Sequence, residues 1–419
     1  MENVPAIAPE LPAPRARGRL LKPLGSAQFR KLWIANNLSL VGDFFSYVAL
    51  AWLVLQLTGS SLALGGVLVA QAVPRSVLMA VGGAFSDRLS ARVTMLGSMG
   101  LRVAVVGPLA ILVLSGRVQM WEVYTASAVF GVVDAFFIPA RSSILPRLVA
   151  DRELEPANAL LNVSSQVALI VGPALAGVVI ASFGTGWAFA ADAACFALGL
   201  PLVFWLPAVK RVAESAASAG QSIAHEIVAG FRYAWNDVGI RALLFIIAAI
   251  DFAANGALGV GLPTLAHGRF DAGATGLGIL FAAWGLGATV GAAGAGILPP
   301  PRRFGWMVVL VAAWIGAGVL ATGLVPSLVP AAAIIAVTGI VSGAVNTYGI
   351  SWLQRRTEAS MQGRVMSLVM LASVGLVPIA YAISGALAQL NPTLLFVAAG
   401  FVMLAAAAAA AGSRTVRSL

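Results

Sequence analysis

The chain has 419 residues, of which 60% are hydrophobic and only 10% are charged. Soluble proteins average about 25% charged residues, so this composition excludes a soluble globular protein and indicates an integral membrane protein. The formal net charge is +10, and the chain has one cysteine and two histidines. A single cysteine excludes an intramolecular disulfide and a cysteine-cluster metal site. We therefore expect no metal site and no cofactor.

The apolar stretches predict twelve membrane-spanning helices, because a helix needs about 20 apolar residues to cross a hydrocarbon core of ~30 Å. The polar interruptions place them at about 32–57, 61–85, 93–115, 119–140, 158–182, 186–206, 239–266, 274–298, 304–324, 328–353, 364–389 and 391–411. The predicted fold class is an all-α membrane protein with two six-helix, pseudo-symmetric halves.

The longest polar break divides these spans six and six. It defines an N-terminal tail, a first half, a linker, a second half and a C-terminal tail, at residues 1–28, 29–206, 207–238, 239–411 and 412–419. In the linker, Ile223, Ile227, Phe231 and Trp235 recur every four residues. Such a face is typical of an amphipathic helix on the membrane surface, and a linker helix that packs on the bundle is the alternative.

The basic residues predict the orientation of the chain. With both termini inside, only Arg117 and Arg269 fall in outer loops, and most other lysines and arginines fall in inner loops or tails. The positive-inside rule then predicts cytoplasmic termini in the cytoplasmic membrane. Topology explains the net charge, so we expect no nucleic-acid partner. No glycine precedes a lysine, so the phosphate-binding loop of ATPases is missing and we expect no enzyme activity.

The two halves also resemble each other in sequence. The inner loop at 144–153 has a counterpart at 352–364, and Gly172-Pro173 is mirrored by Gly375 and Pro378. Parallel repeats with a substrate site near the midplane are typical of secondary transporters.

Several motifs carry a resemblance to a known family. The loop after the second span reads Gly83-x-x-x-Asp87-Arg88-x-x-x-Arg92, and the fifth span contains Gly172-Pro173-Ala174-Leu175-Ala176-Gly177. Further matching stretches are Val41-Gly42-Asp43, residues 52–60, Ile138-Pro139-Ala140-Arg141 and Gly363-Arg364-Val365. Together they resemble the major facilitator superfamily, in particular its drug:proton antiporter group, which contains macrolide efflux pumps and the enterobactin exporter. Ser90, Ala91 and Ala168 depart from the family pattern.

The resemblance implies an inner gate. Asp87 would accept hydrogen bonds at a helix start near Gly363 and pair with Arg141, which would hold the halves together inside and favour an outward-open state. The alternative is an ordinary charged inner loop. The predicted gate residues are Gly83, Asp87, Arg88, Arg92, Arg141, Gly172, Pro173, Gly177 and Arg364.

Charged residues inside the spans are the candidates for coupling. A rise of 1.5 Å per residue puts Asp43, Arg75, Arg102 and Asp251 near the bilayer centre, and Asp134 about 10 Å above Arg141. An ion there costs at least ~2.5–3.5 kcal/mol, so each needs a partner or water. We expect Asp43 to pair with Arg75, Arg102 or both. Asp251 lacks a basic residue at its depth in its own half, and Asp43, Asp251 and Asp134 are the predicted proton-coupling residues. Static ion pairs between helices are the alternative.

Polar residues on the span faces outline a predicted substrate cavity. Its candidates are Asn36, Tyr47, Gln71, Arg75, Arg102, Asn162, Gln166, Asn255 and Asn346. Hydrogen bonding between helices is the alternative role for these residues.

These observations predict a monomeric, proton-coupled secondary exporter of amphiphilic small molecules such as drugs or antibiotics, with protons, cargo and the lipid bilayer as its partners. Two alternatives remain at this stage. The cargo is an endogenous metabolite such as a siderophore, favoured by positive charge around Arg75 and Arg102, or the chain is a non-transporting sensor or scaffold.

Overall fold

The structure is a computed structural model that describes residues 21–86, 90–207, 231–299, 303–358, 361–413 and 417. In this part of the chain, twelve helical segments are long and apolar enough to cross a membrane, which confirms the number predicted from the sequence. The first half contains α2 (Ala27–Thr58), α3 (Ser61–Ser86), α4 (Ala91–Leu114), α5 (Met120–Ile144), α6 (Asp151–Phe183) and α7 (Thr185–Phe204).

The second half supplies the other six spans. They are α9 (Val238–Gly256) with η4 (Ala257–Gly261), α10 (Leu262–Thr264) and η5 (Leu265–Arg269), then α11 (Gly273–Ile297), α12 (Phe304–Leu324), α13 (Leu328–Arg356), α14 (Gln362–Gly375) with α15 (Val377–Leu390), and α16 (Pro392–Gly412). Short 3-10 turns, η1 (Lys22–Gly25) and η2 (Leu145–Arg147), precede α2 and follow α5.

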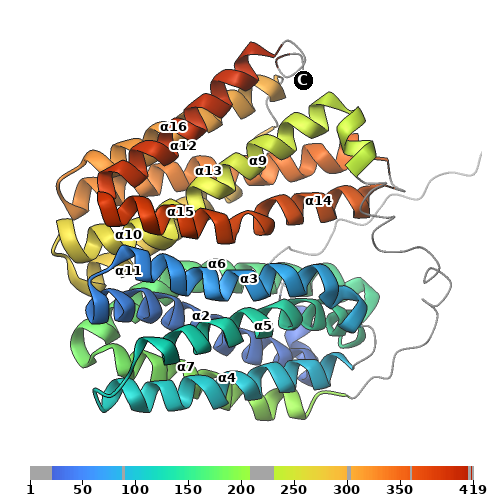
Figure 1. Ribbon diagram of the computed structural model, residues 1–419. Coiled ribbons are helices and arrows are strands. Elements are labelled where there is room, and N and C mark those ends of the chain that lie inside the picture. The colour runs from blue at the N-terminus through green and yellow to red at the C-terminus, as the bar shows by residue number, and fades with distance from the viewer. Residues whose placement is uncertain are drawn as a thin grey trace, which may run out of the picture.

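Figure 1 shows the two halves as separate bundles, the first below and the second above. We call one end of the molecule the short-loop end, because α2 and α3, and α6 and α7, join there through the tight turns at Gly59 and Gly184. Both glycines have positive φ, 62° and 92°, which residues with a Cβ rarely adopt. The opposite end, which carries Arg92, Arg147 and Arg356, is called the basic end.

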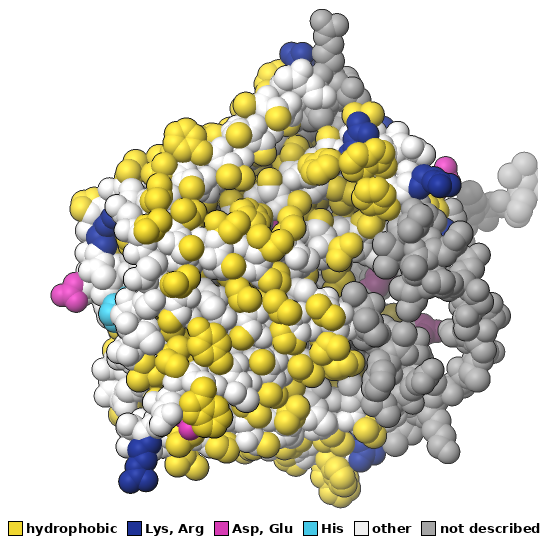
Figure 2. Space-filling model, in the orientation of Figure 1, with side chains coloured by type: hydrophobic (Ala, Val, Ile, Leu, Met, Phe, Trp, Pro, Cys, Tyr) yellow, Lys and Arg dark blue, Asp and Glu magenta, His cyan; other side chains and the backbone are white. Residues whose placement is uncertain are grey.

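The surface between the two ends is apolar. Figure 2 shows hydrophobic side chains over the middle of this face, whereas charged side chains gather toward its edges. That distribution matches a hydrocarbon core with polar membrane surfaces on either side.

Among the described residues, the apolar core that joins the two halves lies toward the short-loop end. One cluster combines first-half residues such as Leu53 and Leu64 with second-half residues such as Leu262 and Leu265. Among the described residues the cores toward the basic end are separate: one holds first-half residues such as Phe29, and another holds residues from Ala234, just before α9, to Ala410. In the described part of the chain the halves therefore share an apolar core toward the short-loop end and have separate apolar cores toward the basic end.

Small residues permit the close contacts between the halves. A Cβ on Gly65 of α3 would lie 2.8 Å from Gly385 Cα on α15, and one on Gly177 of α6 would lie 2.6 Å from the Ala274 carbonyl oxygen on α11. Small residues at such positions let membrane helices approach closely where a larger side chain would separate them.

The eleventh span departs from its sequence prediction. It was expected as one helix at 364–389, but α14 ends at Gly375 and α15 begins at Val377, with Pro378 in its first turn. Pro378 has no N–H to donate to the Val374 carbonyl one turn earlier. The Ser76 hydroxyl of α3 donates to that carbonyl at 3.1 Å. The break is thereby tied to the first half of the protein.

The predicted linker helix lies largely outside the described residues, including Ile223 and Ile227. Phe231 and Trp235 are within a described helical segment at 231–236, where their rings stack 5.2 Å apart and are exposed.

Candidate functional site

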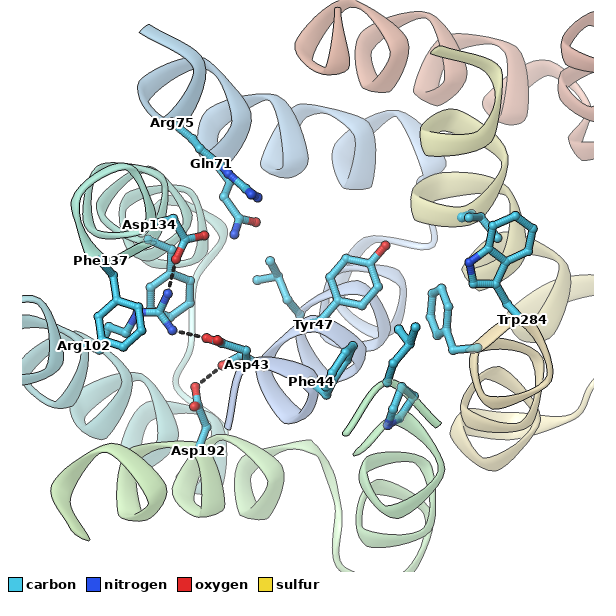
Figure 3. A pocket seen from close by; sticks show the side chains of 17 residues that line it. Asp43, Phe44, Tyr47, Gln71, Arg75, Arg102, Asp134, Phe137, Asp192 and Trp284 are labelled. Carbon is cyan, nitrogen blue, oxygen red and sulfur yellow. Dashed lines mark hydrogen bonds and ion pairs between the residues drawn. The ribbon is translucent and has the colours of Figure 1, made fainter. Parts of the chain in front are cut away.

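A cavity of about 390 Å³ lies between the two halves (Figure 3). Its lining comes mostly from the first half, and the second half supplies Leu258, Phe281 and Trp284. The first-half residues are Asp43, Phe44, Ser46, Tyr47, Leu50, Gln71, Arg75, Arg102, Phe130, Asp134, Phe137, Leu169, Pro173 and Asp192. The volume is within the usual range for small-molecule sites, about 300–1,000 Å³.

Arg102 on α4 is the centre of an ion cluster on one wall. Its Nη1 donates to Asp43 on α2 and its Nη2 to Asp134 on α5. Figure 3 shows both carboxylates directed at the guanidinium group. Arg102 is 7% exposed, and its guanidinium carbon lies 4.6 Å from the centre of the Phe196 ring. The planar fork of arginine suits this double contact, because each acid takes a different nitrogen.

The two acids of this cluster differ in their access to the cavity. The Asp43 side chain is 42% exposed and that of Asp134 is 17% exposed. Asp43 is therefore the carboxylate that water or a ligand in the cavity reaches more readily. The sequence prediction left its partner open between Arg75 and Arg102, and the structure pairs it with Arg102.

Asp192 on α7 is a cavity residue that the sequence analysis missed. Only 1% of it is exposed, and the Ser46 hydroxyl donates to its Oδ2. Its Oδ1 has no hydrogen-bond partner among the described residues. The same depth argument could have found it, because α7 begins at Thr185 and a rise of 1.5 Å per residue puts Asp192 about 10 Å inside.

Arg75 and Gln71 lie one turn apart on α3 and both line the cavity (Figure 3). Within the described part of the chain, Arg75 Nε is buried and has no hydrogen-bond partner. The second half presents aromatic rings instead of charges, and the Phe281 ring lies 5.2 Å from that of Tyr47. The cavity thus has a charged side in the first half and an aromatic side that spans both halves.

Five predicted cavity residues lie away from this lining. Asn36 is 1% exposed and accepts a 2.6 Å hydrogen bond from Arg141. Gln166 donates to Thr289 on α11 at 3.2 Å, and Asn255 donates to the Asp251 carbonyl at 2.7 Å. Asn162 and Asn346 are exposed. Gln166 therefore connects the halves, which is the interhelical role given as the alternative.

Asp251, the proton-coupling candidate of the second half, also lies outside the cavity lining. It is half-buried on α9, a helix that packs on α14. The structure therefore separates Asp251 from the Arg102 cluster that contains the other two candidates.

The predicted gate residues occupy two regions. Gly172 lies against the Phe44 ring of α2, and Pro173 and Gly177 face Gly278 on α11. At the basic end, Arg92 lies 5.0 Å from the centre of the Phe204 ring, and Arg364 Nη1 lies 3.6 Å from Met361 Sδ.

The predicted inner gate around Asp87 lies partly outside the described residues. Gly83 is within α3, whereas Asp87 and Arg88 lie outside the described residues. The partner found for Arg141 is Asn36, on the first half.

Comparison with known proteins supports a transport role. The chain is 28% identical over 371 residues to the multidrug efflux pump Tap of Mycolicibacterium fortuitum, a match that covers 83% of this chain and 86% of that protein. It is 26% identical over 385 residues to the enterobactin exporter EntS of Shigella boydii, covering 90% and 89% respectively.

Solved structures share the fold. The nucleoside transporter NupG superposes with a TM-score of 0.69 at 14% sequence identity, covering 92% of this chain and all of that one. A POT family transporter in complex with 5-aminolevulinic acid gives a TM-score of 0.71 at 14% identity. A family described as transmembrane secretion effector matches residues 19–417. The chain therefore belongs to this family of major facilitator superfamily transporters and is a multi-pass membrane protein.

Proposed function

We propose that this transporter is a proton-coupled exporter of amphiphilic small molecules that acts as a monomer in the cytoplasmic membrane. The observation that carries the proposal is the cavity between the halves, where Asp43 and Asp134 share Arg102. Charged groups at membrane depth are costly, and they are typical of substrate pathways and proton relays.

The basic end faces the cytoplasm in this proposal, because inner loops of membrane proteins are enriched in lysine and arginine. Both termini then lie inside. Among the described residues, the apolar cores of the two halves are separate toward the basic end, which supports an inward-facing state in which cargo reaches the cavity from the cytoplasm. The shared core at the short-loop end closes the outer side.

The charge arrangement supports a coupling mechanism. Asp43 is the more accessible acid of the cluster, and protonation there would remove its attraction to Arg102. Arg102 would then keep Asp134 as its partner and be free to turn toward a third group. Export of cargo followed by release of the proton into the cytoplasm completes the proposed cycle. Asp251 remains a second proton-coupling candidate, located on α9, which packs on α14.

Transport into inside-out vesicles or proteoliposomes with an imposed pH gradient tests this coupling. Asp43→Asn and Asp251→Asn each remove one titratable group, and we expect at least one of them to lose gradient-driven accumulation. Asp271→Asn is the matched control, because Asp271 is an exposed loop residue with φ of 45°, which asparagine tolerates. Full gradient-driven transport by both Asp43→Asn and Asp251→Asn would rule out the proposed coupling.

An endogenous anionic metabolite is a second candidate cargo, and Arg75 is the observation that favours it. Arg102 is neutralised by two carboxylates, but Arg75 has no ion-pair partner among the described residues. An anionic group on an aromatic molecule could bind Arg75 while its ring contacts Trp284 on the opposite side. Competition between matched anionic, neutral and cationic aromatic probes distinguishes the two cargo classes.

A further inference from the structure

We propose that Asp192 is a second proton-binding site of this transporter, occupied in the state described here, and that it exchanges its proton with Asp43 by way of Ser46. The inference rests on the proposed proton-coupled function and assigns a residue to it that neither the motifs nor the family resemblance indicated.

The surroundings of Asp192 suit a neutral carboxyl group. The side chain is 1% exposed, and its one hydrogen bond comes from the uncharged Ser46 hydroxyl. Its Oδ1 has no partner among the described residues, and it lies so close to Gly42 that a Cβ there would overlap it. A buried carboxylate without several donors or a cation costs several kcal/mol, and the group avoids that cost by holding a proton.

Two carboxylates and one arginine lie around Asp192 in the cavity lining. The helices packed against α7 present Asp43 from α2 and Arg102 from α4, and Asp134 of α5 also acts on it. The acids of α6 are at the basic end, in the first turns of that helix, and Cys195 on α7 itself adds a thiol.

The charges of the residues that line the cavity sum to zero when one of its three acids is neutral. Arg75 and Arg102 supply two positive charges to the lining, and Asp43 and Asp134 supply two negative charges. A third carboxylate would leave the buried cavity with an excess negative charge. Among the described residues, Asp192 is the one of the three acids that forms no ion pair, so the proton belongs there.

The positions of Asp43, Ser46 and Asp192 in the cavity lining allow a proton exchange. Ser46 comes three residues after Asp43 on α2, which places both on one helix face. In the state described, the Ser46 hydroxyl donates to Asp192 Oδ2, so the exchange begins when this hydroxyl turns toward the Asp43 carboxylate, directly or through one water molecule, and protonated Asp192 donates to Ser46 Oγ. The O–H bond of Asp192 then breaks as Ser46 Oγ accepts its proton, and the Ser46 hydroxyl proton passes to the Asp43 carboxylate. The negative charge thereby moves from Asp43 to Asp192, and the number of protons is unchanged.

Arg102 can rearrange to bind Asp192 once Asp192 carries the negative charge. Its Nε is buried and has no hydrogen-bond partner among the described residues, so this N–H is a donor that neither Asp43 nor Asp134 uses. Once Asp192 is ionised, that donor can serve it, while neutral Asp43 is left on the exposed side of the cluster. The proton then leaves through the cavity.

Infrared spectroscopy of the purified full-length protein tests the site without any cargo. At neutral pH we expect a carbonyl absorption of a protonated carboxyl group, sensitive to deuterium exchange, that Asp192→Asn lacks and the Asp271→Asn control retains. Ser46→Ala keeps the acid and removes its hydrogen bond, so the same absorption should shift to higher frequency. Unchanged carboxyl absorption in both Asp192→Asn and Ser46→Ala would overturn the proposal.

Transport assays separate this inference from the proposed function. We expect Asp192→Asn to lose cargo accumulation driven by a pH gradient. Gradient-driven accumulation at the wild-type level would overturn the role of Asp192 in coupling. A wild-type protein that ignores the pH gradient but shows the Asp192 absorption would contradict the proposed function and leave the buried neutral acid established.

Discussion

Replacing Arg102 by glutamine is the sharpest test of the ion cluster. The substitution removes the cation that both Asp43 and Asp134 contact, and it leaves the mostly buried Asp134 without its ionic partner. Breaking a buried ion pair by removing one partner costs about 3–5 kcal/mol. Asp43 is 42% exposed and can be hydrated from the cavity, so Asp134 should account for most of the loss.

A double-mutant cycle tests whether this loss of stability arises from the ion pair between Arg102 and Asp134. Asp134→Asn alone leaves Arg102 with Asp43, and the double variant Arg102→Gln, Asp134→Asn removes the uncompensated charge as well as the cation. We expect the double variant to be more stable than Arg102→Gln, with a coupling free energy of about 1–3 kcal/mol.

The free energy of unfolding, measured in detergent by denaturant titration, gives each corner of the cycle. Arg92→Gln is the control on the same helix, because Arg92 lies over the Phe204 ring and makes a contact worth about 0.5–1 kcal/mol. An Arg102→Gln loss no larger than that of the control, or single losses that add within ~0.5 kcal/mol, would refute the cluster as a stabilising unit.

Three further predictions address other parts of the molecule. Arg75→Gln should lower the affinity for anionic aromatic probes about 10- to 100-fold in binding titrations, as expected for one charged hydrogen bond, and leave cationic probes unaffected. Gly65→Val should separate α3 from Gly385, so that spin-label distances between the halves increase at the short-loop end. Burial alone would raise the pKa of Asp237, but hydrogen bonds from the start of α9 and from Arg356 at 3.0 Å lower it below its ordinary value. This stabilisation, at most about 1 kcal/mol, is present above pH ~3.9 and lost as pH falls through the lower folded pKa; Asp237→Asn should show no such loss in thermal unfolding.

The sequence indicated how deep the charged residues lie in the membrane, but it did not indicate which helix each of them faces. Hydropathy placed twelve spans, and counting residues along them put Asp43, Arg102 and Asp134 within reach of the same level of the membrane. Depth is one coordinate, however, and it cannot tell which helix faces which. The partner of Asp43 therefore stayed open between two arginines at similar depth until the arrangement of α2, α4 and α5 was known.

Some predicted cavity residues lie outside the cavity lining for the same reason. Asn36 and Tyr47 share one face of α2, but that face extends past the cavity toward the basic end, where Asn36 meets Arg141. Gln166 lies on the face of α6 that packs on α11, so its amide is used by Thr289. A polar face on a membrane helix indicates a polar neighbour, and only the packing shows whether that neighbour is cargo or another helix.

The two halves contribute different kinds of residue to the cavity lining, and this constrains how proton binding is coupled to cargo transport. The charged lining of the cavity belongs to the first half, whereas the second half contributes Leu258, Phe281 and Trp284. A proton moving within the first half therefore does not alter a charge contact across this cavity, because the described lining residues of the second half are uncharged. It can act through the helices that carry the acids, and α2 also carries Phe44, which packs on Gly172 of α6. Since α6 lies directly on α11 through Gly177, a shift of α2 is passed to the contact between the halves. Cargo that fills the cavity touches both sides, and its binding and the proton's position are thus linked through the same helices.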